Sequence, residues 1–218
     1  MQFIDFQLIQ RSFLFVLTGL PYTIGIAGLS FVTGSLLGTM IAIMRTSRNR
    51  FLKLLARVYV STMRGVPMIV VLFMLYFGLP YLNIQMPALL CAYIGFSLVS
   101  SAYISEIFRS AILAVDDGQW EAAKSLGLPI FKVIRYIILP QAFRIAIPPL
   151  GNVMLDMIKS SSLAAMITVP DIFQNAKIVG GREWDYMSMY VLVAFIYWVL
   201  CFIFEIFQNY VENKLTIY

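Results

Sequence analysis

The chain has 218 residues, of which 61% are hydrophobic and 12% are charged, and its net charge is +5. The charged share is about half that of an average soluble domain, and apolar residues cover nearly the whole length at a mean hydropathy of +0.84, which excludes a soluble protein with one anchor. The chain contains no histidine and two distant cysteines, so a catalytic histidine is excluded and neither a metal site nor a disulfide framework is expected.

Charge-poor runs predict five membrane-spanning helices, since about 20 residues of helix cross a hydrocarbon core of about 30 Å. The first occupies most of the charge-free run 12–44, after a lead-in that ends near Pro21, and we expect it to be retained rather than removed as a signal peptide. The others extend from about Leu54 to Leu79, Pro87 to Ile107, Arg144 to Pro170 and Met187 to Ile206. We therefore expect an all-α membrane protein whose residues 1–218 form a single transmembrane domain.

Small residues mark the first of these spans and prolines mark the fourth. The first contains Gly25, Gly28, Gly34 and Gly38. Such residues let the backbones of neighbouring membrane helices approach, so we interpret them as a packing signal. The fourth contains Pro148, Pro149 and Gly151. An interrupted helix frees backbone groups, which are tolerated at membrane depth where they line a cavity.

Lysine and arginine are concentrated in two of the four connections between the predicted spans. The first connection holds Arg45, Arg48, Arg50, Lys53, Arg57 and Arg64, and the third holds Arg109, Lys124, Lys132, Arg135 and Arg144. The second holds none and the fourth holds only Lys177 and Arg182. The positive-inside rule therefore places the N-terminus outside and the C-terminus in the cytoplasm. This bias accounts for the net charge, so a lipid bilayer is expected as partner and nucleic acid is not.

The third connection, at about residues 110–140, is long enough to contain a helix of its own. Asp116 and Asp117 offer an N-cap, and Gly127 suits the left-handed position that ends a helix. These signals predict a cytoplasmic helix of about two turns from Gly118 to Leu126. A helix this short is not stable alone in water, so it must dock on another surface.

Apolar residues of this short helix give it one docking face. Trp120, Ala123 and Leu126 follow a spacing close to i, i+3. The surface they contact is left open by the pattern itself, because the helix could equally lie on the membrane.

The same segment carries a motif with fixed spacing. Glu121-Ala122-Ala123, Gly127 and Ile137-Ile138-Leu139-Pro140 match EAA-x3-G-x9-I-x-LP without a departure. This match resembles the EAA motif of ABC importer permeases of the type I fold. Further segments resemble the polar amino acid permease subfamily, which includes histidine, glutamine, arginine and cystine permeases. These segments are Arg64–Pro67, Tyr103–Arg109, Asp117–Gln119, Pro140–Ala142 and Lys159–Leu163. One residue departs from the subfamily, because Ser161 stands where it has threonine.

The resemblance implies an importer subunit in a bacterial inner membrane that is not itself an enzyme. Its short helix would be the coupling helix, seated in a groove of an ABC ATPase dimer that binds ATP and Mg²⁺, while this chain holds no cofactor and lacks a G-x-x-x-x-G-K-[ST] sequence. The implied partners are that dimer, an extracytoplasmic substrate-binding protein and a second permease, either identical or related. The residues that would couple to the ATPase are Gln119, Glu121, Ala122, Ala123, Leu126 and Gly127, with the two alanines permitting close approach.

Charged groups inside the fourth predicted span are candidates for a substrate site. Ionisable groups at membrane depth are expensive and are functional candidates by default. Asp156 and Lys159 lie three residues apart, flanked by Asn152 and Ser160, and Asp156 could meet the ammonium group of an amino acid. The alternative is that the two charges simply pair with each other. A second such pair, Glu106 with Arg109, is expected to be structural.

Three other classes of function fit the sequence less well. An ion-coupled secondary carrier is disfavoured by five spans without an internal repeat. An intramembrane hydrolase would need a nucleophile, paired carboxylates or a metal site within the spans, and only Asp156 is deeply placed. A bare membrane anchor would explain the docking helix but would leave the charges in the spans without a role.

Overall fold

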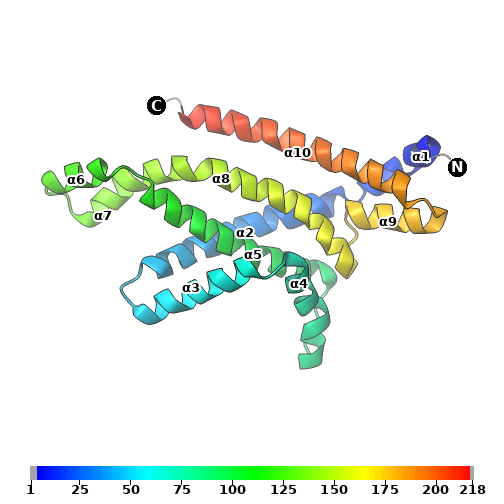
Figure 1. The fold of residues 1–218 in the computed structure, drawn as a ribbon, viewed down its shortest axis with the longest axis horizontal. Coiled ribbons are helices and arrows are strands. Elements are labelled where there is room, and N and C mark those ends of the chain that lie inside the picture. Colours follow the sequence, from blue (N-terminus) through cyan, green and yellow to red (C-terminus); the bar gives the residue numbers. More distant parts are fainter. Residues whose placement is uncertain (1–3, 217–218) are drawn as a thin grey trace.

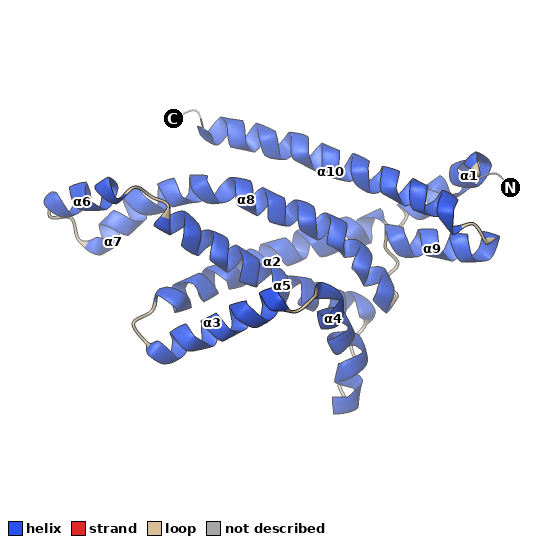
Figure 2. Cartoon of the chain, viewed as in Figure 1, coloured by secondary structure: helices blue, strands red, loops and turns tan. Residues whose placement is uncertain are grey.

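A computed structural model describes residues 4–216, and its regular elements are helical throughout that range (Figure 2). The α-helices are α1 Phe6–Leu17, α2 Leu20–Thr46, α3 Arg50–Gly65, α4 Met68–Phe73, α5 Ala88–Leu113, α6 Asp117–Ser125, α7 Ile130–Val133, α8 Leu139–Ser160, α9 Ile172–Glu183 and α10 Tyr186–Thr216. Between them lie the π-helical turns η1 Met74–Gly78 and η3 Ile134–Ile138 and the 3₁₀ turns η2 Leu79–Leu82 and η4 Ser161–Ile167.

The helices form an elongated bundle with two distinct ends (Figure 1). One end carries the turn between α2 and α3 together with α6 and α7, and the other carries α1 and α9. The buried core joins α2, α4, α5, α8 and η4; its members include Ile26, Leu72, Phe96, Ile158 and Ile167. The predicted cytoplasmic connections therefore lie at the same end of the molecule.

Fewer helices meet the requirements for crossing a membrane than the sequence predicted. Within residues 4–216, α2, α5 and α10 are long and apolar enough, and a fourth span results if the bent pair of α3 with the segment from α4 to η2 counts as one. The predicted fourth span corresponds to α8, which has 22 residues but includes Arg144, Asp156 and Lys159. The five spans and the external N-terminus stay predictions.

The second predicted span is not one straight helix. The axes of α3 and of the segment from Met68 to Leu82 differ by 104°. Val66 is extended, with φ −91° and ψ 130°, and Pro67 follows it. Proline has no backbone N–H and disfavours helical geometry in the residue before it, so the chain turns here. The expectation of a single helix from Leu54 to Leu79 was therefore wrong.

The fourth predicted span is more continuous than expected, whereas the second was less so. Pro148 and Pro149 lie inside α8, which continues through them to Ser160. The helix tightens into η4 only from Ser161, and the left-handed Thr168 then ends that turn. The expected interruption at the prolines was wrong, and the change of helix type occurs about three turns later.

Small residues set the distance between α2 and α5. A Cβ atom on Gly38 would lie 3.0 Å from the backbone oxygen of Ser101, and one on Gly34 would also meet α5. By contrast, a Cβ on Gly25 or Gly28 meets no atom within 4 Å. The predicted packing signal thus applies to two of the four glycines.

Hydroxyl groups add polar contacts along the same pair of helices. Ser30 donates to the backbone oxygen of Tyr93 at 3.2 Å, and the hydroxyls of Thr33 and Ser97 lie 2.7 Å apart. Side-chain hydroxyls that hydrogen-bond between helices stabilise membrane bundles modestly. The contact between α2 and α5 is therefore both close and polar.

A buried carboxyl joins several elements at the other end of the bundle. Asp171 is the N-cap of α9 and accepts the backbone N–H of Gln174 at 2.8 Å, while the hydroxyl of Tyr197 lies 3.4 Å away. Burial raises the pKa of Asp171 to about 6, although the hydrogen bond from Gln174 opposes the shift. The folded protein therefore retains this proton at a pH where an exposed aspartate has lost it.

The glycine contact predicts unequal effects for two identical substitutions. Gly38→Val should destabilise the protein by about 1 to 3 kcal/mol, because added atoms overpack a close contact, and the melting temperature of the detergent-purified protein should fall. Gly25→Val is the matched control on the same helix, where space is open. Equal melting temperatures for the two variants would contradict the packing role of Gly38.

The buried aspartate predicts a pH dependence of stability. The pKa of Asp171 is about 6 in the folded protein and 3.8 for an unperturbed aspartate. Its contribution to the free energy of unfolding is therefore fully present below the lower pKa and is lost as the pH rises through the higher one. Between pH 5 and pH 7 the free energy of unfolding of the wild type should fall by about 1 kcal/mol more than that of the Asp171→Asn variant, which keeps a capping side chain. The chain has no histidine to titrate in this range. If the melting temperatures of the two proteins changed equally with pH, the raised pKa of Asp171 would be refuted.

Candidate functional site

Local signals define both ends of the short helix α6. The Asp116 side chain accepts the backbone N–H of Gly118 at 2.8 Å, which caps the start. At the other end, Gly127 has φ +68° and donates its N–H to the Lys124 oxygen at 2.9 Å. This left-handed conformation favours glycine. The predicted helix and its glycine stop are therefore confirmed.

The apolar face of α6 docks on the same chain. Ala123 is 1% exposed and belongs to a cluster with Ala111 of α5, Ile138 of η3 and Ala142 of α8, against which Trp120 also packs. This contact supplies the docking that so short a helix needs. It also corrects one expectation, because Ala123 supports α6 from behind and has no surface for a partner to approach.

The opposite face of α6 is open. Glu121 and Ala122 are exposed, and Leu126, expected on the docking face, is 77% exposed. The neighbouring Ile130 and Phe131 are 59% and 68% exposed. Together Glu121, Ala122, Leu126, Ile130 and Phe131 form what we term the coupling face: one carboxylate and apolar side chains that are exposed on α6, at its C-terminal end and at the start of α7.

Gln119 connects α6 to α8 instead of standing free. The side-chain nitrogen of Gln141 donates to the Gln119 side-chain oxygen at 3.2 Å and to the Ile137 backbone oxygen at 2.9 Å. Gln141 is the third residue of α8 and directly follows the last motif residue, Pro140. Gln119 therefore links the coupling face to the start of α8.

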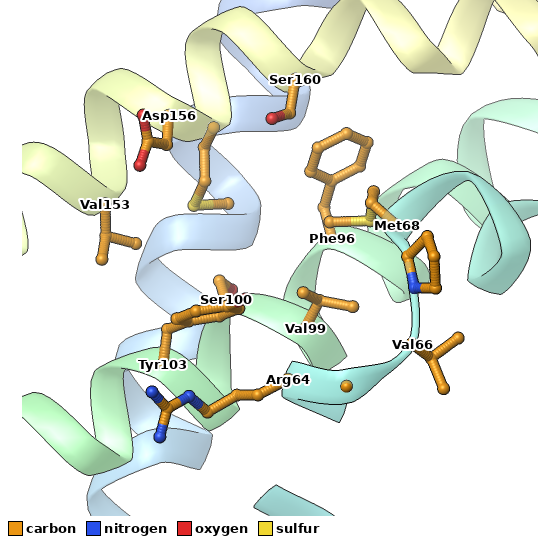
Figure 3. Close-up of a pocket in the computed structure, with 13 residues that line it drawn as sticks. Arg64, Val66, Met68, Phe96, Val99, Ser100, Tyr103, Val153, Asp156 and Ser160 are labelled. Atoms are coloured by element: carbon orange, nitrogen blue, oxygen red, sulfur yellow. The ribbon is translucent and has the colours of Figure 1, made fainter. Parts of the chain in front are cut away.

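A cavity of about 430 Å³ lies where α3 bends into α4 (Figure 3). Its walls come from the bend, from α5 and from α8; they include Arg64, Pro67, Phe96, Tyr103, Asp156 and Ser160. Figure 3 shows Asp156 and Ser160 on one side of this space and Arg64 and Tyr103 on the other. Groups of opposite charge thus occupy two walls of one mainly apolar cavity.

The structure divides the four residues expected at a substrate site. Asp156 and Ser160 line the cavity, whereas Asn152 is exposed and neither it nor Lys159 belongs to the lining. Lys159 Nζ lies 2.9 Å from an oxygen of Asp156, with 58% and 73% of the respective side chains exposed. The ion pair considered as the alternative is therefore present, and the Asp156 carboxylate still reaches the cavity.

A charged cluster next to the cavity was only partly expected. Glu106 pairs with Arg109, as predicted for this structural pair, but it also pairs with Arg45 of α2 and lies 4.0 Å from Arg64. The guanidinium of Arg64 stacks 5.4 Å from the ring centre of Tyr103. The Arg-Gly-Val-Pro run was the available signal, since proline marks the bend that presents Arg64 to the cavity.

Known proteins resemble the chain over nearly its whole length. A probable amino-acid ABC transporter permease protein of Bacillus subtilis, YckA, is 55% identical over 95% of this chain and 92% of its own. The L-cystine transport system permease protein TcyB of the same organism is 41% identical over 99% and 93%. These relatives are named as permease proteins, and the chain is likewise a membrane component and not an enzyme.

Solved structures and a family model agree with these relatives. The crystal structure of an amino acid ABC transporter with histidines contains a chain with a TM-score of 0.93 and 34% identity, covering 97% of this chain and 99% of that one. The MetNI methionine ABC transporter shares the fold, with a TM-score of 0.70 at 17% identity over 97% of both chains. The model of the family described as "Binding-protein-dependent transport system inner membrane component" matches residues 34–217. The chain therefore belongs to the family of inner membrane components of binding-protein-dependent transport systems.

Proposed function

We propose that this chain is the translocating subunit of an importer that carries amino acids into the cytoplasm by alternating access, driven by ATP hydrolysis on another subunit. The single observation that carries the proposal is the exposed coupling face of α6 and α7, with α6 anchored to the rest of the chain through the buried Ala123. Because α6 is packed firmly against the other helices, a displacement of α6 by a bound partner would move those helices with it. The relatives named as amino-acid permeases support the substrate class.

The coupling face fits an ABC ATPase as its partner. It combines exposed apolar side chains with one carboxylate, a composition that suits insertion into a groove with a polar group at its edge. In this assembly a dimeric ATPase binds ATP and Mg²⁺, an extracytoplasmic binding protein delivers the amino acid, and a second permease, identical or related, completes the pathway. The expected orientation, with α6 in the cytoplasm, follows from the distribution of lysine and arginine.

The cavity at the bend is the proposed passage site for the amino acid. A zwitterion carries an ammonium and a carboxylate, and the cavity offers Asp156 on one wall and Arg64 on another. A charge-assisted hydrogen bond from the substrate ammonium to Asp156 would replace the contact with Lys159. Polar, cationic and cystine-like amino acids fit this chemistry, and the binding protein selects among them.

Reconstitution tests the function as a whole. Proteoliposomes that contain the chain, its ATPase and its second permease should accumulate a labelled amino acid only when ATP and the binding protein are both present. Uptake that persists without ATP would replace the proposal with a secondary carrier.

Reversing the charge on the coupling face should uncouple transport. Glu121→Lys should abolish ATP-dependent uptake while membrane insertion and the melting temperature stay unchanged, because the side chain is exposed. Glu205→Lys makes the same reversal on the exposed surface of α10 and serves as control. Gly127→Asp should also abolish uptake, since it strains the left-handed turn. Normal uptake by the Glu121 variant would reject the coupling role.

Substitutions of Asp156 and Lys159 should have different effects on transport if the carboxylate contacts the substrate. Asp156→Asn should weaken transport of a cationic amino acid about tenfold at saturating binding protein, the order expected when one charged hydrogen bond is lost. Lys159→Gln removes the competing partner of Asp156, so transport should be kept or improved. Equal losses in both variants would mean that the pair is only structural.

A further inference from the structure

A second cavity of about 430 Å³ lies at the end of the molecule that carries α6. It is lined by Arg45 and Thr46 at the end of α2, Lys53 and Arg57 in the first half of α3, and Arg109 and Leu113 at the end of α5. Four of the six lining residues are cations. The cavity shares no lining residue with the one at the bend.

The charge of this basic pocket is only partly compensated. Glu106 is the carboxylate in contact with it, and it pairs with both Arg45 and Arg109. Lys53 and Arg57 make no ion pair within the part of the chain that the structure describes. Four cations and one carboxylate leave an excess of three positive charges. Glu106 therefore fixes two of the cations in place, and the other two are available to an anion.

An apolar surface borders the pocket. Leu113 in its lining is 70% exposed, and on α3 the side chains of Phe51, Leu54 and Val58 are 71%, 60% and 55% exposed. On a helix of a membrane protein, this amphipathic division places the apolar side chains toward acyl chains and the cations toward headgroups. The anion that fits here is one joined to hydrocarbon.

We propose that this basic pocket binds the phosphate of an anionic phospholipid headgroup. Guanidinium groups match phosphate oxygens in paired hydrogen bonds, and basic pockets between membrane helices are suited to anionic headgroups. Inorganic phosphate shares this chemistry but would leave the bordering apolar side chains unused. The bound lipid bridges α2, α3 and α5 at this end of the molecule.

Lipid binding by the purified full-length chain tests the proposal. Phosphatidylglycerol and phosphatidylcholine are titrated separately into the detergent-solubilised protein, and bound lipid is counted by native mass spectrometry. Lys53→Gln with Arg57→Gln should lower the affinity for phosphatidylglycerol at least tenfold, because each cation near an anionic headgroup contributes to binding. Arg48→Gln with Lys132→Gln removes the same two residue types outside the pocket lining, and should leave the affinity within about twofold of wild type.

Three results would overturn the assignment. The first is equal binding of the two lipids by wild type, a readout that needs no variant to fold. The second is equal loss of phosphatidylglycerol in the pocket variant and its control, and the third is displacement of the lipid by millimolar inorganic phosphate, which would indicate a site for the free anion. The charge-keeping pair Lys53→Arg with Arg57→Lys should retain the lipid.

Discussion

The close approach of α2 and α5 is the contact on which the rest of the bundle depends. In a bilayer, apolar surface alone does not draw helices together, since lipid is as apolar as a leucine side chain. The glycines at 34 and 38 and the hydroxyls beside them supply backbone proximity and hydrogen bonds instead. Once α5 is fixed in this way, its residues form one wall of the cavity at the bend, and Glu106 on α5 forms its ion pairs next to that cavity. The C-terminal end of α5 packs in the cluster that supports α6.

Features coded by neighbouring residues were predictable, and features set by contacts across the bundle were not. The bounds of α6 and its left-handed glycine depend on a local cap and stop, so sequence spacing was sufficient. The 104° bend was missed because Pro67 lies in a run that hydropathy alone makes continuous. That Ala123 is buried against its own chain could not be predicted from the motif either, because the motif fixes the spacing of residues and not the surface against which each one packs.

The two readings of Asp156 proved compatible. A charged pair three residues apart on a helix forms readily, and its presence says nothing against a role in binding. The location of Asp156 is the stronger argument for a role in binding, since its carboxylate borders the cavity and its lysine partner does not. Arg64 on the facing wall was not among the expected site residues, because it precedes a proline whose effect on direction appears only when the helices are assembled.

The helix α8 is continuous from the cluster under α6 to the cavity at the bend. Ala142 near its start packs in the cluster under α6, and Asp156 near its end borders the cavity; these residues are roughly 20 Å apart along the axis at 1.5 Å per residue. Pro148 and Pro149 lie midway and lower the bending stiffness there, because each removes a backbone hydrogen-bond donor. In the proposed importer, a displacement of α6 would reach the cavity through α8, and its size there would depend on how much the helix bends at the two prolines.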